Sequence, residues 1–233
     1  MPVKEKIFSL RERLALVCSK AHRAPESIVV VAVSKGVSIP EIEEALAAGI
    51  HDIGENRVQE ALVKYNGLSA KRYPLNAVKW HMVGHLQTNK ARDAVRIFDL
   101  IHSVDSLRLA QEIDSQAAKI GKTQEILLEV KTSPEATKFG FDPKEVITAA
   151  KDILKLKNIK LKGLMTMAPV AQAPELTRPY FRGLKELLDK INSLQLTAYS
   201  LQLLSMGMTD DFEVAIEEGA TIIRIGRGIF GSS

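Results

Sequence analysis

Short apolar runs recur at intervals along the chain. Several of them are rich in Val and Ile, which is typical of strands buried on both faces. The runs are Ile28–Ser34, Ile50–Gly54, Val78–Gly84, Leu100–Val104, Glu125–Val130, Leu161–Met167, Leu201–Met206 and Thr221–Ile225. The pattern therefore predicts eight short strands.

Between these runs lie segments with apolar residues at helical spacing. Most of them have a capping residue at the start or a glycine at the end. The predicted helix starts are Ser38, Asp105, Asp142 and Thr209, and the predicted glycine ends are Gly49, Gly121 and Gly219. Successive strand starts lie between 20 (221 − 201) and 40 (201 − 161) residues apart, which leaves room for a helical crossover between parallel strands. This alternation is typical of a (β/α)8 barrel or an open doubly wound sheet.

The two ends of the sequence favour the barrel. Only two residues follow Gly231, so we expect no helix after strand 8. An extra amphipathic helix precedes the first strand and would cover the position that this leaves bare. We therefore expect residues 1–233 to form one (β/α)8 TIM barrel domain with an extra N-terminal helix, closed by pairing of Val29–Val33 with Ile222–Ile225. The apolar stripe of that first helix is Ile7, Leu10, Leu14, Val17 and Ala21.

The amino-acid composition mainly excludes certain classes of protein. Hydrophobic residues make up 45% and charged residues 26% of the chain, which excludes a disordered protein. The single cysteine, Cys18, excludes an intramolecular disulfide and suits a reducing cytoplasm, and we expect it to be a packed thiol. No apolar run approaches the roughly 20 residues of a membrane span, and the N-terminal stretch lacks the apolar block of a secretion signal. We expect a cytoplasmic protein with no membrane partner.

The net charge of +4 raises the question of a nucleic-acid partner. Aromatic residues are only 5% of the chain, however, and basic residues alternate with acidic ones almost everywhere. We expect no nucleic-acid partner. No apolar face stands out beyond what barrel helices need, so we expect a monomer.

Lys35 ends the first apolar run. In a barrel, residues at the carboxyl ends of the strands face the active site, so we expect Lys35 in the barrel mouth. A lysine that is desolvated there has a lowered pKa and can form a Schiff base with an aldehyde.

Two loops near the end of the sequence suit a phosphate group. Phosphate sites in barrels are often built from the loops after strands 7 and 8, which here are Ser205–Thr209 and Gly226–Gly228. Their glycines let the backbone approach closely, and Ser205 offers a hydroxyl. Tight turns alone would explain the glycines of either loop, but two such loops at the expected strands favour a phosphate site.

Two other motifs give weaker evidence of a function. Gly226–Gly231 matches the G-x-G-x-x-G dinucleotide fingerprint, but that motif needs a following helix, a second strand and an acidic residue. The sequence after Gly231 leaves no room for them. His81 and His85 lie four residues apart without an evident third ligand, so we expect no zinc site.

Arg224 lies inside the last apolar run, where an arginine is costly unless it has a partner. Because side chains alternate along a strand and Arg224 lies two residues before Gly226, it can point into the barrel beneath the expected phosphate. An imine-forming lysine, a phosphate site and an arginine between them suit pyridoxal 5′-phosphate (PLP), whose pyridine nitrogen would face the arginine.

Five segments closely resemble the pyridoxal phosphate homeostasis protein family, which itself looks like the barrel domain of alanine racemase. The resemblance runs in unbroken order from the first strand to Gly231. Its segments are Val31–Ser38, Gly54–Glu60, Trp80–Lys90, Leu164–Pro169 and Ser205–Gly231.

The resemblance implies a role for six residues. Lys35 would carry PLP as a Schiff base, and Arg224 would meet the pyridine nitrogen, with Asn56 near the ring. Ser205 and the backbone of Gly226 and Arg227 would hold the phosphate.

Two positions depart from the family's usual residues. Members often carry a serine where Thr209 stands, and this change keeps the hydroxyl. They often carry Ser-Gly where Phe139-Gly140 stands, and Phe139 cannot make the polar contact of a serine.

The resemblance implies a protein that binds PLP for intracellular homeostasis, buffering it or delivering it to PLP-dependent apoenzymes without substrate turnover. Racemisation needs acid/base groups on both faces of the substrate, and the racemase-like architecture takes one of them from a second domain for which this chain has no residues. Arg224 also stays protonated, so it is a poor proton donor to the ring nitrogen and weakens the cofactor as an electron sink.

Two enzyme alternatives stay open at this point. One is a small PLP-dependent amino-acid racemase or decarboxylase that uses Lys35 with His81 or Tyr65. The other is a Schiff-base aldolase acting on a phosphosugar. Visible imine absorbance separates the PLP readings from the aldolase, and turnover of amino acids separates an enzyme from a carrier.

Overall fold

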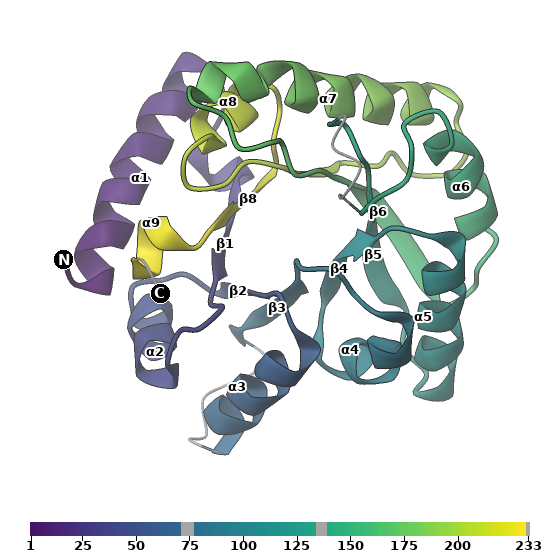
Figure 1. Ribbon diagram of the computed structural model, residues 1–233, viewed down its shortest axis with the longest axis horizontal. Helices are drawn as coiled ribbons and strands as arrows, with labels where there is room; N and C mark the ends of the chain where they lie inside the picture. Colours follow the sequence, from purple (N-terminus) through teal and green to yellow (C-terminus); the bar gives the residue numbers. More distant parts are fainter. Residues whose placement is uncertain (71–76, 134–138, 232–233) are drawn as a thin grey trace.

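The computed structural model describes residues 1–70, 77–133 and 139–231. Within these ranges, eight parallel strands close into a barrel in sequence order, with helices around the outside (Figure 1). The predicted (β/α)8 barrel is confirmed. The strands are β1 (Val29–Val33), β2 (Asp52–Glu55), β3 (Lys79–Met82), β4 (Leu100–Val104), β5 (Gln124–Glu129), β6 (Ile159–Met165), β7 (Leu203–Ser205) and β8 (Ile222–Ile225).

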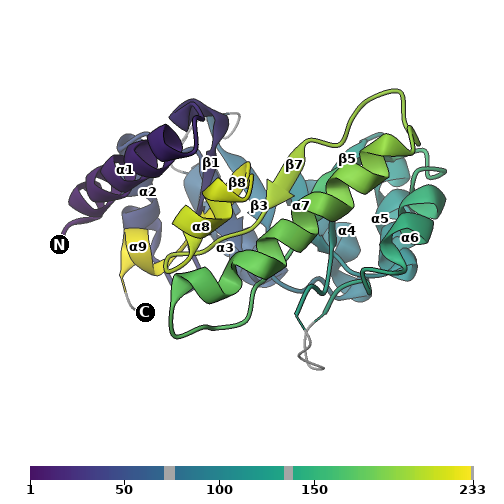
Figure 2. The ribbon, with the colours of Figure 1, turned by 90° about the horizontal axis from the view of Figure 1, so that it is seen from above.

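The helices form a layer outside the strands, and α8 lies between α1 and α7 (Figure 2). Among the described residues, no helix combines the length and apolar character that crossing a bilayer requires. The helices are α1 (Val3–Lys20), α2 (Ile39–Ala47), α3 (Val58–Ala70), α4 (Ala91–Ile97), α5 (Leu107–Lys119), α6 (Val146–Ile153), α7 (Arg178–Ser193), α8 (Phe212–Glu217) and α9 (Arg227–Phe230), with short 3-10 turns η1 (Pro25–Ser27), η3 (Thr88–Lys90) and η4 (Pro174–Thr177).

The start and end of α2 follow the predicted signals. The backbone N–H and the hydroxyl of Ser38 donate to the Glu41 carboxylate at 3.0 and 2.7 Å, so the first turn is capped. Gly49 adopts φ +84° just after the helix, a conformation that favours glycine.

Three predicted helix starts are wrong by one to three residues, because the residues before α5, α6 and α8 are Ser106, Glu145 and Asp211. The hydroxyl of Ser106 caps α5 by accepting from Leu109, so the helix does not start from Asp105. Residues 142–145 form a turn before α6, and residues 208–211 form one before α8. The second turn is held by the Asp211 carboxylate, which accepts from the Met208 N–H at 2.6 Å. Thr209 therefore lies in a loop and does not begin a helix.

The barrel closes where sequence position predicted. Val29 pairs with Ile222 and Ala32 with Ile225, which joins β1 to β8. Helix α1 packs against α8 and α9, and so covers the outside of this seam (Figure 1). The predicted covering role of the first helix is confirmed.

The expected absence of a helix after strand 8 is wrong. One turn of helix, α9, follows β8 directly. The N–H groups of Ile229 and Phe230 donate to the Gly226 carbonyl at 3.0 and 2.9 Å. Four residues suffice for a single turn, and α1 packs against it, which is why the end of the sequence is helical.

The barrel has two apolar layers. Most buried residues lie between the strands and the helices. Cys18 is one of them and is fully buried, as predicted, and this burial raises the pKa of its thiol. A smaller apolar cluster lies inside the barrel: Val31, Val83, Leu100, Leu127, Met165 and Ile222. The interior also carries buried polar side chains, and these lead to the site described below.

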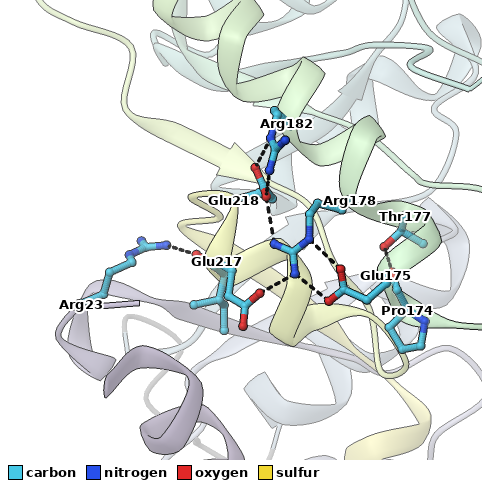
Figure 3. A network of polar contacts seen from close by, with 9 residues as sticks. Arg23, Pro174, Glu175, Thr177, Arg178, Arg182, Glu217 and Glu218 are labelled. Atoms are coloured by element: carbon cyan, nitrogen blue, oxygen red, sulfur yellow. Dashed lines mark hydrogen bonds and ion pairs between the residues drawn. The ribbon is translucent and has the colours of Figure 1, made fainter. Parts of the chain in front are cut away.

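An ionic network ties the segment before α7 to α8 (Figure 3). The guanidinium of Arg178 lies 2.6 Å from Glu175, 2.6 Å from Glu217 and 2.9 Å from Glu218. Thr177, which precedes α7, lines the cavity at the barrel mouth. The network therefore anchors one wall of that cavity to α8.

Candidate functional site

A cavity of about 670 Å³ opens at the barrel mouth, where the carboxyl ends of the strands meet. This volume falls within the roughly 300–1,000 Å³ of small-molecule sites. Loops after β1, β2, β3, β6, β7 and β8 form its walls. Among the residues predicted from sequence, Lys35, Asn56, Arg224, Gly226 and Arg227 line it, and Ser205 does not.

Lys35 follows β1 and lines the cavity, as predicted from its place in the strand. Val31 and Val33 point into the barrel, and alternation puts the next inward position at residue 35. The side chain is exposed, however, and the expected desolvation of Lys35 is wrong. Ser34, between β1 and Lys35, is fully buried, and its hydroxyl bonds Glu55 at the end of β2.

A buried ion pair holds the backbone beside Lys35. Nζ of Lys64, on α3, lies 2.5 Å from the Ser34 carbonyl oxygen and 2.6 Å from Oε1 of Glu55. The Ser34 hydroxyl also donates to Glu55. Burial raises the pKa of Glu55, and the hydrogen bonds from Lys64 and Ser34 oppose that rise. Removing one member of such a pair leaves a buried charge without its partner, which is strongly destabilising.

A second contact holds the other side of the same turn. Oε1 of Glu60 accepts from the Gly36 N–H at 2.6 Å and from Lys64 at 2.8 Å. Burial acts to raise the pKa of Glu60, but the hydrogen bonds from Lys64 and Gly36 lower it overall. The residues on both sides of Lys35 are therefore fixed to α3 and to the end of β2.

Sequence reasoning missed these supporting residues. Glu60 and Lys64 stand four apart on a helix, a spacing that brings opposite charges together. That signal alone does not reveal that the pair faces the first strand.

Asn56 lies just after β2 and is half-buried at the cavity wall. The loop after β3 packs tightly on it, because a Cβ on Gly84 would lie 2.5 Å from the Asn56 carbonyl oxygen. A glycine is therefore required beside Asn56.

Arg224 lies inside the barrel, as predicted from its place in β8. Its Nη1 donates to Ser205 Oγ at 2.6 Å and its Nη2 to the Thr166 carbonyl at 2.9 Å. Burial lowers its pKa to about 10, against the opposing effect of Glu129 and Asp211, so the guanidinium stays charged at neutral pH. A buried cation thus forms part of the cavity wall.

The predicted contact between Ser205 and a phosphate conflicts with its placement. Ser205 is fully buried, and its hydroxyl bonds Arg224 and, at 2.8 Å, His102. It is the last residue of β7 and points inward, whereas the following loop reaches the cavity at Met208 and Thr209. The Thr209 hydroxyl accepts from the Gly228 N–H at 3.2 Å.

Gly226, between β8 and α9, and Arg227, the first residue of α9, lie at the cavity wall. The Arg227 guanidinium pairs with Asp210 across the mouth, and both side chains are exposed. An exposed pair of this kind contributes little stability. It places one charge of each sign at the rim.

The residues that an enzyme alternative would need do not line the cavity. His81 lies inside the barrel, with its Nε2 2.9 Å from Asp52 Oδ1 and its Nδ1 2.9 Å from His102 Nε2. The Tyr65 ring packs edge-on against the Trp80 ring, with the ring centroids 5.8 Å apart. Neither side chain reaches the cavity that Lys35 lines.

His85 is also engaged elsewhere. Its Nδ1 lies 3.1 Å from Asp105, and its ring stacks on Phe139 with centroids 3.6 Å apart. Residue 139 thus supplies an aromatic face, and its side chain is half exposed. Within the described ranges, no three His, Cys, Asp or Glu side chains are grouped so as to hold a metal ion.

The chain resembles several known proteins over almost its whole length. Residues 7–233 match the family described as alanine racemase, N-terminal domain. A pyridoxal phosphate homeostasis protein from Aquifex aeolicus is 42% identical over 97% of this chain and 96% of its own length. The protein of the same name from Escherichia coli is 31% identical over 99% of this chain and 96% of its own length.

Solved structures extend the likeness to three dimensions. PipY from Synechococcus elongatus, solved with PLP bound, is 37% identical, with a TM-score of 0.86 over 98% of this chain and 100% of PipY. An alanine racemase from Clostridium difficile is 15% identical, with a TM-score of 0.74, and its match covers 56% of that enzyme. The second likeness is one of fold alone.

Proposed function

We propose that this chain, which belongs to the family described as alanine racemase, N-terminal domain, and within it to the pyridoxal phosphate homeostasis proteins, binds PLP for homeostasis. We also propose that it turns over no substrate. The observation that carries the proposal is that Lys35 and Arg224 line the same cavity. The PLP held by PipY, a structural relative at 37% identity, supports it.

The donor set at the cavity fits PLP. When PLP is bound, its aldehyde condenses with a lysine amine, so that a C=N bond forms and the carbonyl oxygen leaves as water. Lys35 supplies that amine, and the fixed backbone of Ser34 and Gly36 limits how far it can move. A positioned amine on a rigid turn has less conformational freedom to lose on binding.

Arg224 suits a binding role better than catalysis. Its buried, charged guanidinium can only donate, so it meets the ring nitrogen as a hydrogen-bond donor and disfavours a proton there. A ring nitrogen without a proton is a weak electron sink. His81 and Tyr65, the proton donors expected of a racemase or decarboxylase, lie away from the cavity.

The phosphate end of the ligand is proposed to lie at Gly226 and Arg227, with their backbone N–H groups as donors. Thr209 lines the same part of the cavity and replaces Ser205 as the candidate hydroxyl. Asn56 is proposed to lie near the ring. Charge-assisted hydrogen bonds contribute about 1.5–3 kcal/mol each, so pyridoxal should bind at least about a hundredfold more weakly than PLP.

The wider role is proposed in the same way. We take residues 1–233 as one domain that acts as a monomer in the cytoplasm and delivers PLP to apoenzymes. The single barrel and the names of the relatives support this role.

Borohydride reduction tests the proposal. The purified protein with PLP should absorb visible light, and peptide mapping after reduction should place the pyridoxyl group on Lys35. Lys35→Ala should lose the visible band, whereas Lys90→Ala, a change at a lysine outside this cavity, should keep it. A label on another lysine contradicts the assignment of Lys35, absence of any visible band favours the aldolase alternative, and amino-acid turnover contradicts the binding role.

A further inference from the structure

A chain of hydrogen-bonded side chains crosses the barrel interior from β2 to β8. Asp52 Oδ1 lies 2.9 Å from His81 Nε2, and His81 Nδ1 lies 2.9 Å from His102 Nε2. His102 Nδ1 lies 2.8 Å from Ser205 Oγ, which accepts from Arg224 at 2.6 Å. All members are buried except Asp52, whose side chain is 23% exposed. The chain joins a partly solvated carboxylate to the arginine at the cavity.

One arrangement of the protons in this chain follows from donation by Arg224. Arg224 can only donate, so Ser205 Oγ accepts from it and can turn its own proton toward His102 Nδ1. His102 then carries its proton on Nε2 and donates to His81 Nδ1. His81 in turn carries its proton on Nε2 and donates to Asp52. In this arrangement every donor meets one acceptor, and both histidines are neutral.

The surroundings of His102 agree with a neutral ring. It is fully buried, and burial, followed by the neighbouring His81 and Arg224, lowers its pKa well below the usual value. The chain thus has its positive charge at Arg224 and its negative charge at Asp52. Aligned hydrogen bonds between such ends polarise one another, so each bond supports the next.

Two different strands hold the guanidinium of Arg224. Ser205, at the end of β7, fixes Nη1, and the carbonyl of Thr166, just after β6, fixes Nη2. Two contacts to separate strands define both the position and the plane of the group. Loss of the first contact would let the guanidinium turn about the second.

We propose that Asp52, His81, His102 and Ser205 are positioning residues that hold Arg224 in the orientation in which it meets the cofactor ring. This inference rests on the proposed function, because a bound ring gives that orientation its purpose. It assigns Ser205 to the ring end of the ligand through Arg224, and not to the phosphate end.

Ligand selectivity separates the two roles of Ser205. Ser205→Ala should weaken PLP and pyridoxal by the same factor, about fivefold for the loss of one hydrogen bond, and should shift the visible absorbance maximum of bound PLP. Thr209→Val, the matched loss of a hydroxyl at the cavity itself, should weaken PLP more than pyridoxal and leave the maximum in place. If Ser205→Ala weakens PLP alone with an unchanged maximum, Ser205 is a phosphate ligand and the proposal is overturned.

Nitrogen NMR of the imidazoles tests the chain without any ligand and without a mutation. Both His81 and His102 should be neutral, with the proton on Nε2. A proton on Nδ1 of His102 would overturn the proposal. Because this measurement needs no PLP, it decides the chain even if the protein fails to bind PLP.

The far end of the chain gives an independent check. Asp52→Ala should change the tautomer signal of His81 and shift the absorbance maximum of bound PLP, although Asp52 does not line the cavity. Asp114→Ala is the matched control, because Asp114 is also a half-buried acceptor but bonds Asn158 outside the barrel. If Asp52→Ala leaves both signals unchanged, Asp52 has no positioning role and the proposed chain is wrong.

Discussion

Glu129 ends β5 and is 3% exposed. Burial raises its pKa to about 7, the nearby Asp105 adds to the rise, and Arg224 opposes it. The folded protein therefore holds a carboxyl group that is about half ionised at neutral pH. The unfolded chain, with the ordinary value of 4.5, would hold it fully ionised.

Stability should fall as pH rises through this interval. Because the folded pKa of Glu129 exceeds the unfolded value, folding takes up a proton between pH 4.5 and 7, and the stabilising effect of the neutral form is lost above that range. Each pKa unit corresponds to about 1.4 kcal/mol, so ionised Glu129 costs the folded state about 3 kcal/mol at pH 8. Glu129→Gln should recover much of this cost, as measured by urea unfolding at pH 5 and pH 8.

Glu125→Gln is the control for that measurement. Glu125 stands on the same strand, but its side chain is 41% exposed and lies 3.3 Å from Lys162. It should give no gain in stability at pH 8. If the free energy of unfolding changes with pH in the same way for the wild type and for Glu129→Gln, Glu129 ionises normally in the folded protein.

Single-residue predictions from sequence succeeded where strand position alone decides the placement. Lys35 and Arg224 reach the cavity because alternation along β1 and β8 directs them there. Ser205 differed because its hydroxyl bonds His102, which lies 103 residues away in sequence. No local pattern reveals such a partner. The burial of Glu55 and Lys64 beneath Lys35 was not predicted for the same reason.

At the scale of elements, β6 and β7 approach each other closely at Gly163. Gly163 pairs with Leu203, and a Cβ on it would lie 1.8 Å from the Leu203 carbonyl oxygen. The obstacle is backbone and cannot turn aside. Gly183, within α7, has open space around its Cβ position.

The two glycines should respond in opposite directions to alanine. Gly163→Ala must push β6 away from β7. It should lower the free energy of unfolding by roughly 1–3 kcal/mol or more, the cost of overpacking a core. Gly183→Ala should raise stability by up to about 1 kcal/mol, because alanine is the better helix former. Thermal and urea unfolding of both variants measure this. A Gly163→Ala protein as stable as the wild type would show that the two strands can separate at no cost.

The eight strands and the helices between them were predictable, but α9 and several boundaries were not. Apolar periodicity revealed the eight strands and the helices between them. The start of α5 depends on which side chain caps its first N–H groups, and Ser106 does so in place of the expected Asp105. The start of α8 is delayed because the Asp211 carboxylate accepts from the Met208 N–H and holds a turn ahead of the helix. Neighbouring polar residues offer similar caps, so sequence alone does not choose among them.

On the scale of the whole molecule, α1 seals the seam between β1 and β8 by packing on α8 and α9. The buried residues of α1 include Ile7, Leu10 and Leu14. The covering helix comes from one end of the sequence and the covered ones from the other. Breaking this contact should therefore loosen the barrel as a unit.

We predict a single cooperative unfolding transition for the barrel. Fluorescence of Trp80, the single tryptophan, reports on the packing of β3, and far-UV circular dichroism reports on the helices. Their midpoints in urea should coincide. Leu10→Ala, which should cost about 2–5 kcal/mol as a buried leucine, should lower both midpoints equally, although Leu10 lies on α1. Separate transitions would contradict the proposal that residues 1–233 form one domain.

The seam between β1 and β8 also has a consequence for biosynthesis. While the chain emerges from the ribosome, β1 has one edge unpaired until β8 is made, 193 residues later (222 − 29). At about 5–20 residues per second, that wait lasts roughly 10–40 seconds, during which an open apolar edge is exposed to aggregation and to chaperones. Lys35 and Gly226 follow the two strands of this seam, so the nascent chain lacks a complete cofactor cavity until its last strand is in place.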